Sequence, residues 1–99
     1  MSKGYFIAHI EVTDPDSYIP YRDKAPATVA QYGGTYLTRG GDFETMEGDA
    51  LPPRTVVLEF PSVEAAKAWY NSPEYQEIIG IRHANATGFA QIVEGADWL

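Results

Sequence analysis

The sequence predicts an α+β fold in which one antiparallel sheet of four strands carries its helices on a single face. Four stretches rich in β-branched and aromatic residues alternate with segments whose apolar residues recur at helical spacing. The resulting order is strand, helix, strand, strand, helix, strand. A chain with this β-α-β-β-α-β order forms a sheet with strand order 4-1-3-2, the ferredoxin-like arrangement.

The first strand and the first helix are predicted in the N-terminal third of the chain. Residues 4–12 (GYFIAHIEV) place apolar side chains at alternate positions, as a strand does. Asp14 is a suitable helix cap, and Pro15 fits the first helical position. Apolar residues then recur at helical spacing as far as two consecutive glycines, but Pro20 and Pro26 each remove a backbone hydrogen bond. We therefore expect a kinked or two-piece helix here.

The second and third strands are predicted at residues 35–39 and 54–60, which contain many β-branched and aromatic side chains. Residues 42–53 between them form an acidic loop that carries Phe43 and Met46. This loop lacks the alternating oxygen ligands of a calcium site, so we expect a solvated, extended arm.

A split helix and a fourth strand are predicted in the C-terminal half. Ser62 and Ser72 each stand where a helix cap is needed. Residues 62–71 and 73–84 are therefore expected to form two consecutive helices. Residues 86–94 alternate as a strand and complete the sheet.

The predicted strands present two different faces. One face is almost wholly apolar and is expected to lie under the helices; its members are Phe6, Ala8, Ile10, Val56, Leu58 and Phe60. The opposite face mixes apolar and polar side chains, namely Tyr5, Ile7, His9, Thr55, Val57, Glu59, Phe89, Gln91 and Val93. This second face is too apolar to stay solvated, and two copies that meet across a two-fold axis would bury it. We therefore predict a homodimer.

Composition limits the class of protein. The 99 residues are expected to form a single domain, residues 1–99, and the net charge of −7 disfavours nucleic acid and anionic membrane surfaces as partners. The chain has no cysteine, no signal-peptide pattern and no apolar run of membrane-spanning length, so we expect a cytoplasmic protein without disulfides. The seven tyrosines favour a wet pocket or an interface, and Trp98 is expected to pack rather than lie exposed.

Several stretches together resemble a known family. They are GYFIAHIEVTDPDSY near the start, YGG at 32–34, RGG at 39–41, EG at 47–48 and EFPSVEAAKAWYNSPEY at 59–75. Over nearly its whole length the chain resembles domain-of-unknown-function family 1330, within the dimeric α+β barrel superfamily. The resemblance implies a ferredoxin-like fold and a barrel formed by two sheets that meet face to face, but no reaction. Superfamily relatives include cofactor-independent monooxygenases, haem-dependent enzymes and lactone isomerases, which are analogies of fold.

His9 and Glu59 are the candidate catalytic residues. Both lie on the mixed face, and the predicted strand order places them on neighbouring strands, within cross-strand reach. A carboxylate beside an imidazole is the usual way to orient histidine as a general base. The alternative is a partly buried histidine that Glu59 or water satisfies, with no role in chemistry.

Four residues are candidates for substrate binding: Tyr21, Arg39, Trp69 and Tyr75. Arg39 ends the second strand before two glycines, where the backbone can approach a ligand closely and a guanidinium can hold a carboxylate. A turn with a salt bridge explains the same residues. The three aromatic residues are expected to meet between the helices and the sheet, either as the wall of a cleft or as ordinary core.

The sequence leaves the type of function open. It contains no clustered metal ligands, Gly-rich phosphate loop, nucleophile elbow or dinucleotide motif, so neither a metal nor a cofactor is predicted. The first hypothesis is a protein that binds or transforms a small aromatic or carboxylated metabolite by oxygenase- or isomerase-like chemistry. The second is a non-catalytic module that senses or sequesters a ligand, and the third is a structural protein without a pocket.

Overall fold

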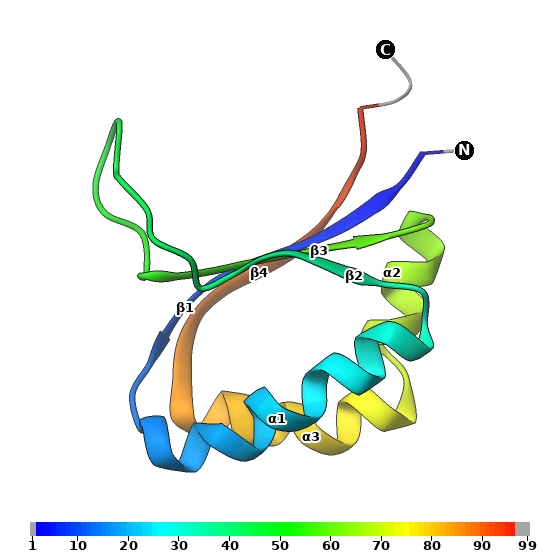
Figure 1. Cartoon of the computed structure of the whole chain (residues 1–99), viewed down its shortest axis with the longest axis horizontal. Helices are drawn as coiled ribbons and strands as arrows, with labels where there is room; N and C mark the ends of the chain where they lie inside the picture. The colour runs from blue at the N-terminus through cyan, green and yellow to red at the C-terminus, as the bar shows by residue number, and fades with distance from the viewer. Residues whose placement is uncertain (1, 97–99) are drawn as a thin grey trace.

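The computed structural model describes residues 2–96, which form one curved sheet with helices on one side (Figure 1). Trp98 lies outside the described residues. All four strands begin and end where the sequence predicts. The elements are β1 (Gly4–Val12), α1 (Pro15–Gln31), β2 (Thr35–Arg39), β3 (Arg54–Phe60), α2 (Val63–Tyr70), α3 (Pro73–Asn85) and β4 (Ala86–Glu94).

The sheet is antiparallel and has the order β2-β3-β1-β4, which is the predicted 4-1-3-2 arrangement counted from the other edge. β1 lies in the middle and pairs along its whole length with β4. The three helices cover one face of the sheet (Figure 1), so the other face is left without a helical layer from this chain. The predicted ferredoxin-like α+β fold is confirmed.

The helices begin at the predicted caps. Asp14, Ser62 and Ser72 each accept a hydrogen bond from the backbone N–H three residues ahead, over 3.2, 3.0 and 3.1 Å. α1 continues through Pro20 and Pro26 as one helix of 17 residues, so the two-piece alternative is wrong. Each proline removes a single N–H, and the helix continues on either side of it. A kink at these prolines stays a prediction.

The core lies between the sheet and the helices, with Trp69 of α2 at its centre. The Trp69 side chain is 1% exposed, and its ring centroid lies 4.1 Å from that of Tyr75 and 5.0 Å from that of Phe6. Its indole N–H donates to the hydroxyl of Thr28 over 3.1 Å, so the buried polar atom is satisfied. These contacts fix α2 and α3 against the sheet. Of the predicted helix-facing residues, all are buried except Val56, which is half-buried.

Residues 40–53 lie outside these layers. In Figure 1 this green segment projects from the sheet on the side away from the helices. Its large apolar side chains Phe43, Met46 and Leu51 are 59, 79 and 57% exposed, and none of its residues belongs to a helix or strand. Within residues 2–96, no helix has both the length and the apolar character needed to cross a bilayer.

Candidate functional site

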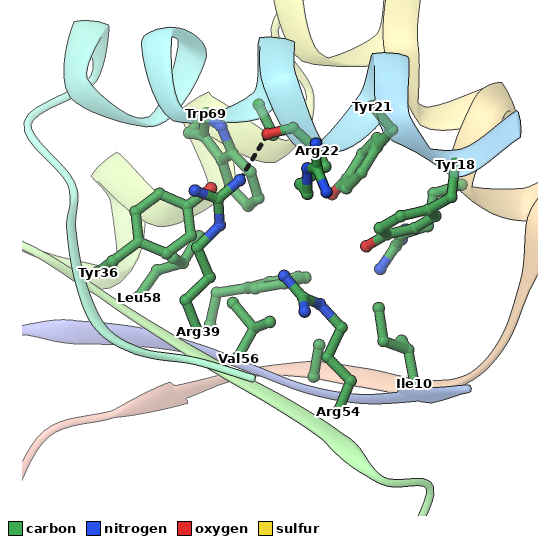
Figure 2. A pocket seen from close by; sticks show the side chains of 14 residues that line it. Ile10, Tyr18, Tyr21, Arg22, Tyr36, Arg39, Arg54, Val56, Leu58 and Trp69 are labelled. Atoms are coloured by element: carbon green, nitrogen blue, oxygen red, sulfur yellow. Dashed lines mark hydrogen bonds between the residues drawn. The ribbon is translucent and has the colours of Figure 1, made fainter. Parts of the chain in front are cut away.

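A cavity lies between α1 and the sheet (Figure 2). Its volume of about 30 Å³ leaves room for about one or two water molecules. β1, β2 and β3 supply one wall and α1 supplies the opposite wall, while α2 and α3 each contribute one residue. The lining residues are Phe6, Ala8, Ile10, Tyr18, Tyr21, Arg22, Ala25, Tyr36, Arg39, Arg54, Val56, Leu58, Trp69 and Arg82.

The cavity gathers positive charge in a chain whose net charge is −7. All four arginines of the sequence line it, namely Arg22, Arg39, Arg54 and Arg82. No aspartate, glutamate or histidine occurs among the described residues of its lining. A hollow lined by charge of one sign and enclosed by apolar walls concentrates the electrostatic potential, so this cavity attracts anions.

Arg39 reaches the cavity because β2 contains a bulge. Tyr36 pairs with Leu58 and Arg39 pairs with Val56, so β2 has one extra residue between these two pairs. Successive residues of a regular strand face opposite sides, so Tyr36 and Arg39, three positions apart, would lie on different faces without the bulge. Instead both side chains point toward the cavity (Figure 2), with the Arg39 guanidinium carbon 5.1 Å from the centroid of the Tyr36 ring.

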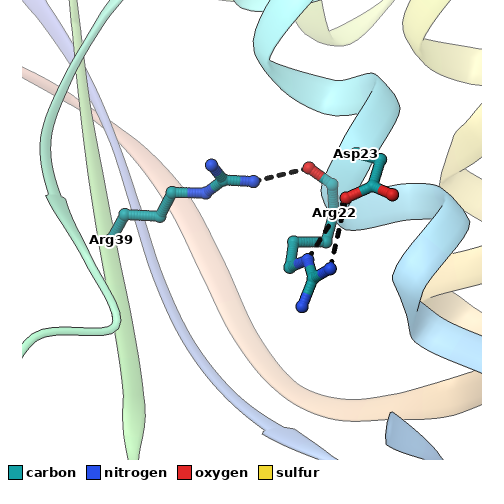
Figure 3. Close-up of polar contacts among 3 residues, drawn as sticks. All are labelled: Arg22, Asp23 and Arg39. Atoms are coloured by element: carbon teal, nitrogen blue, oxygen red, sulfur yellow. Dashed lines mark hydrogen bonds and ion pairs between the residues drawn. The ribbon is translucent and has the colours of Figure 1, made fainter. Parts of the chain in front are cut away.

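A hydrogen bond from Arg39 ties the β2 edge of the sheet to α1. The Nη2 atom of Arg39 donates to the backbone carbonyl of Arg22 over 2.5 Å (Figure 3). The Arg22 guanidinium turns toward Asp23, with its Nε and Nη2 atoms 3.3 Å from one carboxylate oxygen. All three residues are exposed, so this ion pair contributes little stability. Arg39 therefore has a neutral acceptor, for which a ligand carboxylate would compete.

Arg54, which is half-buried, and Arg82, which is buried, also line the cavity. The Nε atoms of both are buried and have no hydrogen-bond partner within residues 2–96. Arg82 is 7% exposed, and its guanidinium carbon lies 5.9 Å from the centroid of the Tyr21 ring. A buried N–H without an acceptor is unfavourable, because its hydration is lost and no protein group replaces it.

Tyr21 and Tyr75 form a hydrogen-bonded pair near Arg82. Their hydroxyl oxygens lie 2.6 Å apart. Burial raises the pKa of both phenols, that of Tyr75 to about 12, while the positive charge of Arg82 acts in the opposite direction. Both hydroxyls are therefore protonated at neutral pH and are available as donors rather than as bases.

The predicted substrate-binding residues do meet between the helices and the sheet. Tyr21, Arg39 and Trp69 line the cavity, and Tyr75 is connected to it through the hydroxyl of Tyr21. Trp69 and Tyr75 also form the core, so the cleft and core interpretations describe the same aromatic cluster.

The predicted pairing of His9 with Glu59 is wrong. The register of β1 and β3 places His9 opposite Thr55, and the imidazole Nδ1 lies 3.1 Å from the Thr55 hydroxyl. Glu59 lies opposite Tyr5 and accepts hydrogen bonds from Lys3 over 3.2 Å and from the Tyr5 hydroxyl over 3.0 Å. These two bonds lower the pKa of Glu59, that from Lys3 having the larger effect. His9 and Glu59 thus lie apart, on the face of the sheet opposite to the cavity.

The family described as Domain of unknown function (DUF1330) matches residues 3–96. The chain belongs to this family. No curated protein matches the sequence.

Solved structures show where the DUF1330 fold recurs. A protein of unknown function from Rhodopseudomonas palustris has a TM-score of 0.71 and 18% identity, over 94% of this chain and 80% of its own. SnoaB, a cofactor-independent oxygenase from Streptomyces nogalater, has a TM-score of 0.66 and 13% identity, over 94% of this chain and 92% of its own. An antibiotic biosynthesis monooxygenase has a TM-score of 0.51 and 16% identity, over 95% of both chains. At these identities the likeness shows a shared fold.

In this DUF1330 chain, Arg54 and Arg82 are the cavity residues that sequence reasoning missed. Arg54 precedes Val56 by two positions, so the strand period places it on the helix side of the sheet. Arg82 follows Tyr75 by seven positions and Ile78 by four, so helical spacing places it on the buried face of α3. The feature of the sequence that could have revealed both residues is an arginine at a position where the spacing of the strand or helix predicts a buried side chain.

Proposed function

We propose that this protein binds a small planar metabolite in the cavity between α1 and the sheet. The observation that carries the proposal is the lining itself, in which the aromatic rings of Tyr21, Tyr36 and Trp69 stand beside several arginines (Figure 2). Ligand sites combine such apolar and aromatic walls with a few charged groups that orient the ligand. The present volume holds only water, so binding requires side chains at the margin to move. Arg22 and Arg39 are exposed there, and each gives up one exposed contact, with Asp23 and with the Arg22 carbonyl respectively, when it moves.

The lining is suited to stabilising negative charge rather than to removing a proton. Its described residues include no carboxylate and no histidine, and the phenols of Tyr21 and Tyr75 are protonated. Guanidinium groups beside a bound enol or phenol lower its pKa and stabilise its anion. His9, which the sequence suggested as a base, lies on the other face of the sheet and does not support proton abstraction in this cavity.

We propose cofactor-free oxygenation as the reaction of this site. An electron-rich enolate or phenolate is the form of a substrate that reacts with oxygen without a cofactor, and the cavity favours such an anion. SnoaB, which shares the fold, is a cofactor-independent oxygenase. Ligand sequestration without turnover is the second candidate, because the same charges hold an anion that does not react.

A cavity-filling variant tests the binding site. Ala25 of α1 is 3% exposed and lines the cavity, whereas Ala27 is exposed on the same helix. Planar metabolites are screened by thermal shift, and binders are followed through the indole N–H resonance of Trp69. Ala25→Leu is expected to abolish the ligand-induced rise in Tm, while Ala27→Leu retains it. A ligand that stabilises Ala25→Leu as well as the natural chain binds elsewhere, and the proposal is then wrong.

Oxygen uptake separates the two candidates. The bound ligand is incubated with the protein in air, oxygen is followed with an electrode and the product is examined by mass spectrometry. Oxygen consumption that Ala25→Leu abolishes supports the oxygenase. A ligand that is bound and recovered unchanged supports sequestration.

We also propose that two copies pair through the face of the sheet opposite to the helices. Phe89 and Val93 on this face are 69 and 38% exposed, and Ile7 and Val57 beside them are only half-buried. Pairing across a two-fold axis would remove these side chains from water. Size exclusion with light scattering is expected to show a dimer that Phe89→Asp converts to a monomer. Ala84→Asp, at an exposed position on α3, should leave the dimer intact. A natural chain that is monomeric at micromolar concentration contradicts this proposal.

A further inference from the structure

We propose that Arg54 and Arg82 form a site for the acidic group of the ligand, and that the pocket is specific for planar aromatic carboxylates. This inference rests on the proposed function, because it names the class of molecule that the cavity accepts.

Ile10 locates the acid site within the fold. Ile10 pairs with Arg54 across β1 and β3, and both line the cavity. Ile10 and Arg82 also line an open groove of about 500 Å³ that runs along the first half of β4. Arg82 therefore stands between the inner cavity and the groove. A ligand that extends from the groove into the cavity brings its acidic group against Arg82 on a path toward Arg54.

In both arginines the buried Nε atom lacks, within the described chain, the partner that burial normally demands. The buried Nε atoms of Arg54 and Arg82 have no hydrogen-bond acceptor within residues 2–96, and no described acidic residue lines the cavity. Buried arginines are normally paired with an anion. The exposed cations Lys3 and Arg22 do have carboxylate partners, Glu59 and Asp23. Within residues 2–96 no carboxylate forms an ion pair with Arg54 or Arg82, which leaves both available to a ligand anion.

The surroundings favour a carboxylate on a flat ring over a phosphate. A guanidinium binds either group with two parallel hydrogen bonds. Phosphate sites commonly add backbone N–H groups from glycine-rich loops or the first turn of a helix. The described lining contains no glycine, serine or threonine. Its one residue from the start of α1 is Tyr18, whose backbone N–H already donates to the carbonyl of Asp14 over 3.0 Å. It contains instead the rings of Tyr18, Tyr21 and Trp69, against which a planar aromatic acid can stack.

Benzoate and benzamide provide the test, because they share a ring and nearly the same size but differ in charge. Binding of each to the full chain is measured by isothermal titration calorimetry, with inorganic phosphate as a third probe. Benzoate is expected to bind about tenfold more tightly than benzamide and more tightly than phosphate. Arg82→Gln is expected to lower the affinity for benzoate about tenfold and to leave that for benzamide unchanged.

Two further variants keep the test decisive. Arg54→Gln is expected to have the same effect as Arg82→Gln. If Arg82→Gln does not fold, Arg54→Gln replaces it in the test. Lys67→Gln removes an exposed charge from α2, outside the cavity, and is expected to change neither affinity. Affinity for benzoate that survives both arginine substitutions overturns the inference.

The failure of this inference is distinguishable from failure of the proposed function. If benzamide binds as tightly as benzoate and Ala25→Leu abolishes both, the cavity is a binding site but its ligands are not selected by charge. If phosphate binds more tightly than benzoate, the acid site accepts phosphates and the carboxylate class is wrong. If neither aromatic probe binds at millimolar concentration, the proposed function fails together with the inference.

Discussion

Replacement of Arg82 with methionine is expected to stabilise the free protein. Methionine keeps the apolar stem of the side chain and deletes a guanidinium whose Nε is buried without a partner. An unsatisfied buried donor costs about 1–3 kcal/mol. The substitution also removes two favourable interactions. The cation–π contact with Tyr21 at 5.9 Å is near its outer limit and is worth about 0.5 kcal/mol. The interaction of the positive charge with the last turn of α3 is worth about 0.5 kcal/mol.

The balance is a stabilisation of about 1 kcal/mol, which raises the Tm of a chain of this length by about 4–8 °C. Urea unfolding followed by circular dichroism and differential scanning calorimetry measure the two quantities. Arg22→Met is the control, because Arg22 is exposed and pairs only with exposed Asp23; its stability should change by no more than about 0.5 kcal/mol. If Arg82→Met is less stable than the natural chain by 1 kcal/mol or more, the guanidinium is a structural element and the reasoning is refuted.

Three other outcomes follow from the structure. Gly88→Ala is expected to lower the free energy of unfolding by about 3 kcal/mol or more, because Gly88 has a φ of 145° and a Cβ there would overlap the carbonyl oxygen of His9; an unchanged urea midpoint would contradict this. Ser72→Ala is expected to cost about 1–2 kcal/mol in the same assay, because the hydroxyl caps α3 at the N–H of Tyr75; a loss below 0.5 kcal/mol would argue against the cap. The contribution of Tyr75 to stability is expected to be constant from pH 8 to about 10 and to fall as the pH rises toward 12, because the pKa of Tyr75 is near 10 when unfolded and about 12 when folded. Thermal melts from pH 8 to 11.5 should show a shallower fall for Tyr75→Phe, and identical profiles would refute the role of this phenol.

The elements and their order could be predicted because local chemistry determines them. Ser62 and Ser72 mark helix starts wherever they occur before a helical pattern, and they cap α2 and α3 here. The strand register could not be predicted in this way. It depends on which backbone groups of β1 and β3 bond to each other across the sheet, and this pairing brings Thr55 rather than Glu59 beside His9.

The candidate site was predictable only where periodicity alone decides the direction of a side chain. Tyr21 and Trp69 lie on the inner faces of their helices, as their spacing indicates. Arg39 faces the cavity only because β2 contains an extra residue, and no local signal in the sequence marks that bulge. Arg82 was overlooked because arginine is usually an exposed residue, although its spacing from Tyr75 places it inside.

Successive side chains of β1 alternate between the cavity and the opposite face of the sheet. Phe6, Ala8 and Ile10 contribute to the cavity, whereas Ile7 and His9 between them belong to the opposite face. Changes at even-numbered positions of this strand can therefore alter the lining of the cavity while the opposite face is unchanged, and changes at odd-numbered positions can do the reverse. Duplicated copies of such a gene are free to diverge in the lining of the cavity without first changing the opposite face of the sheet.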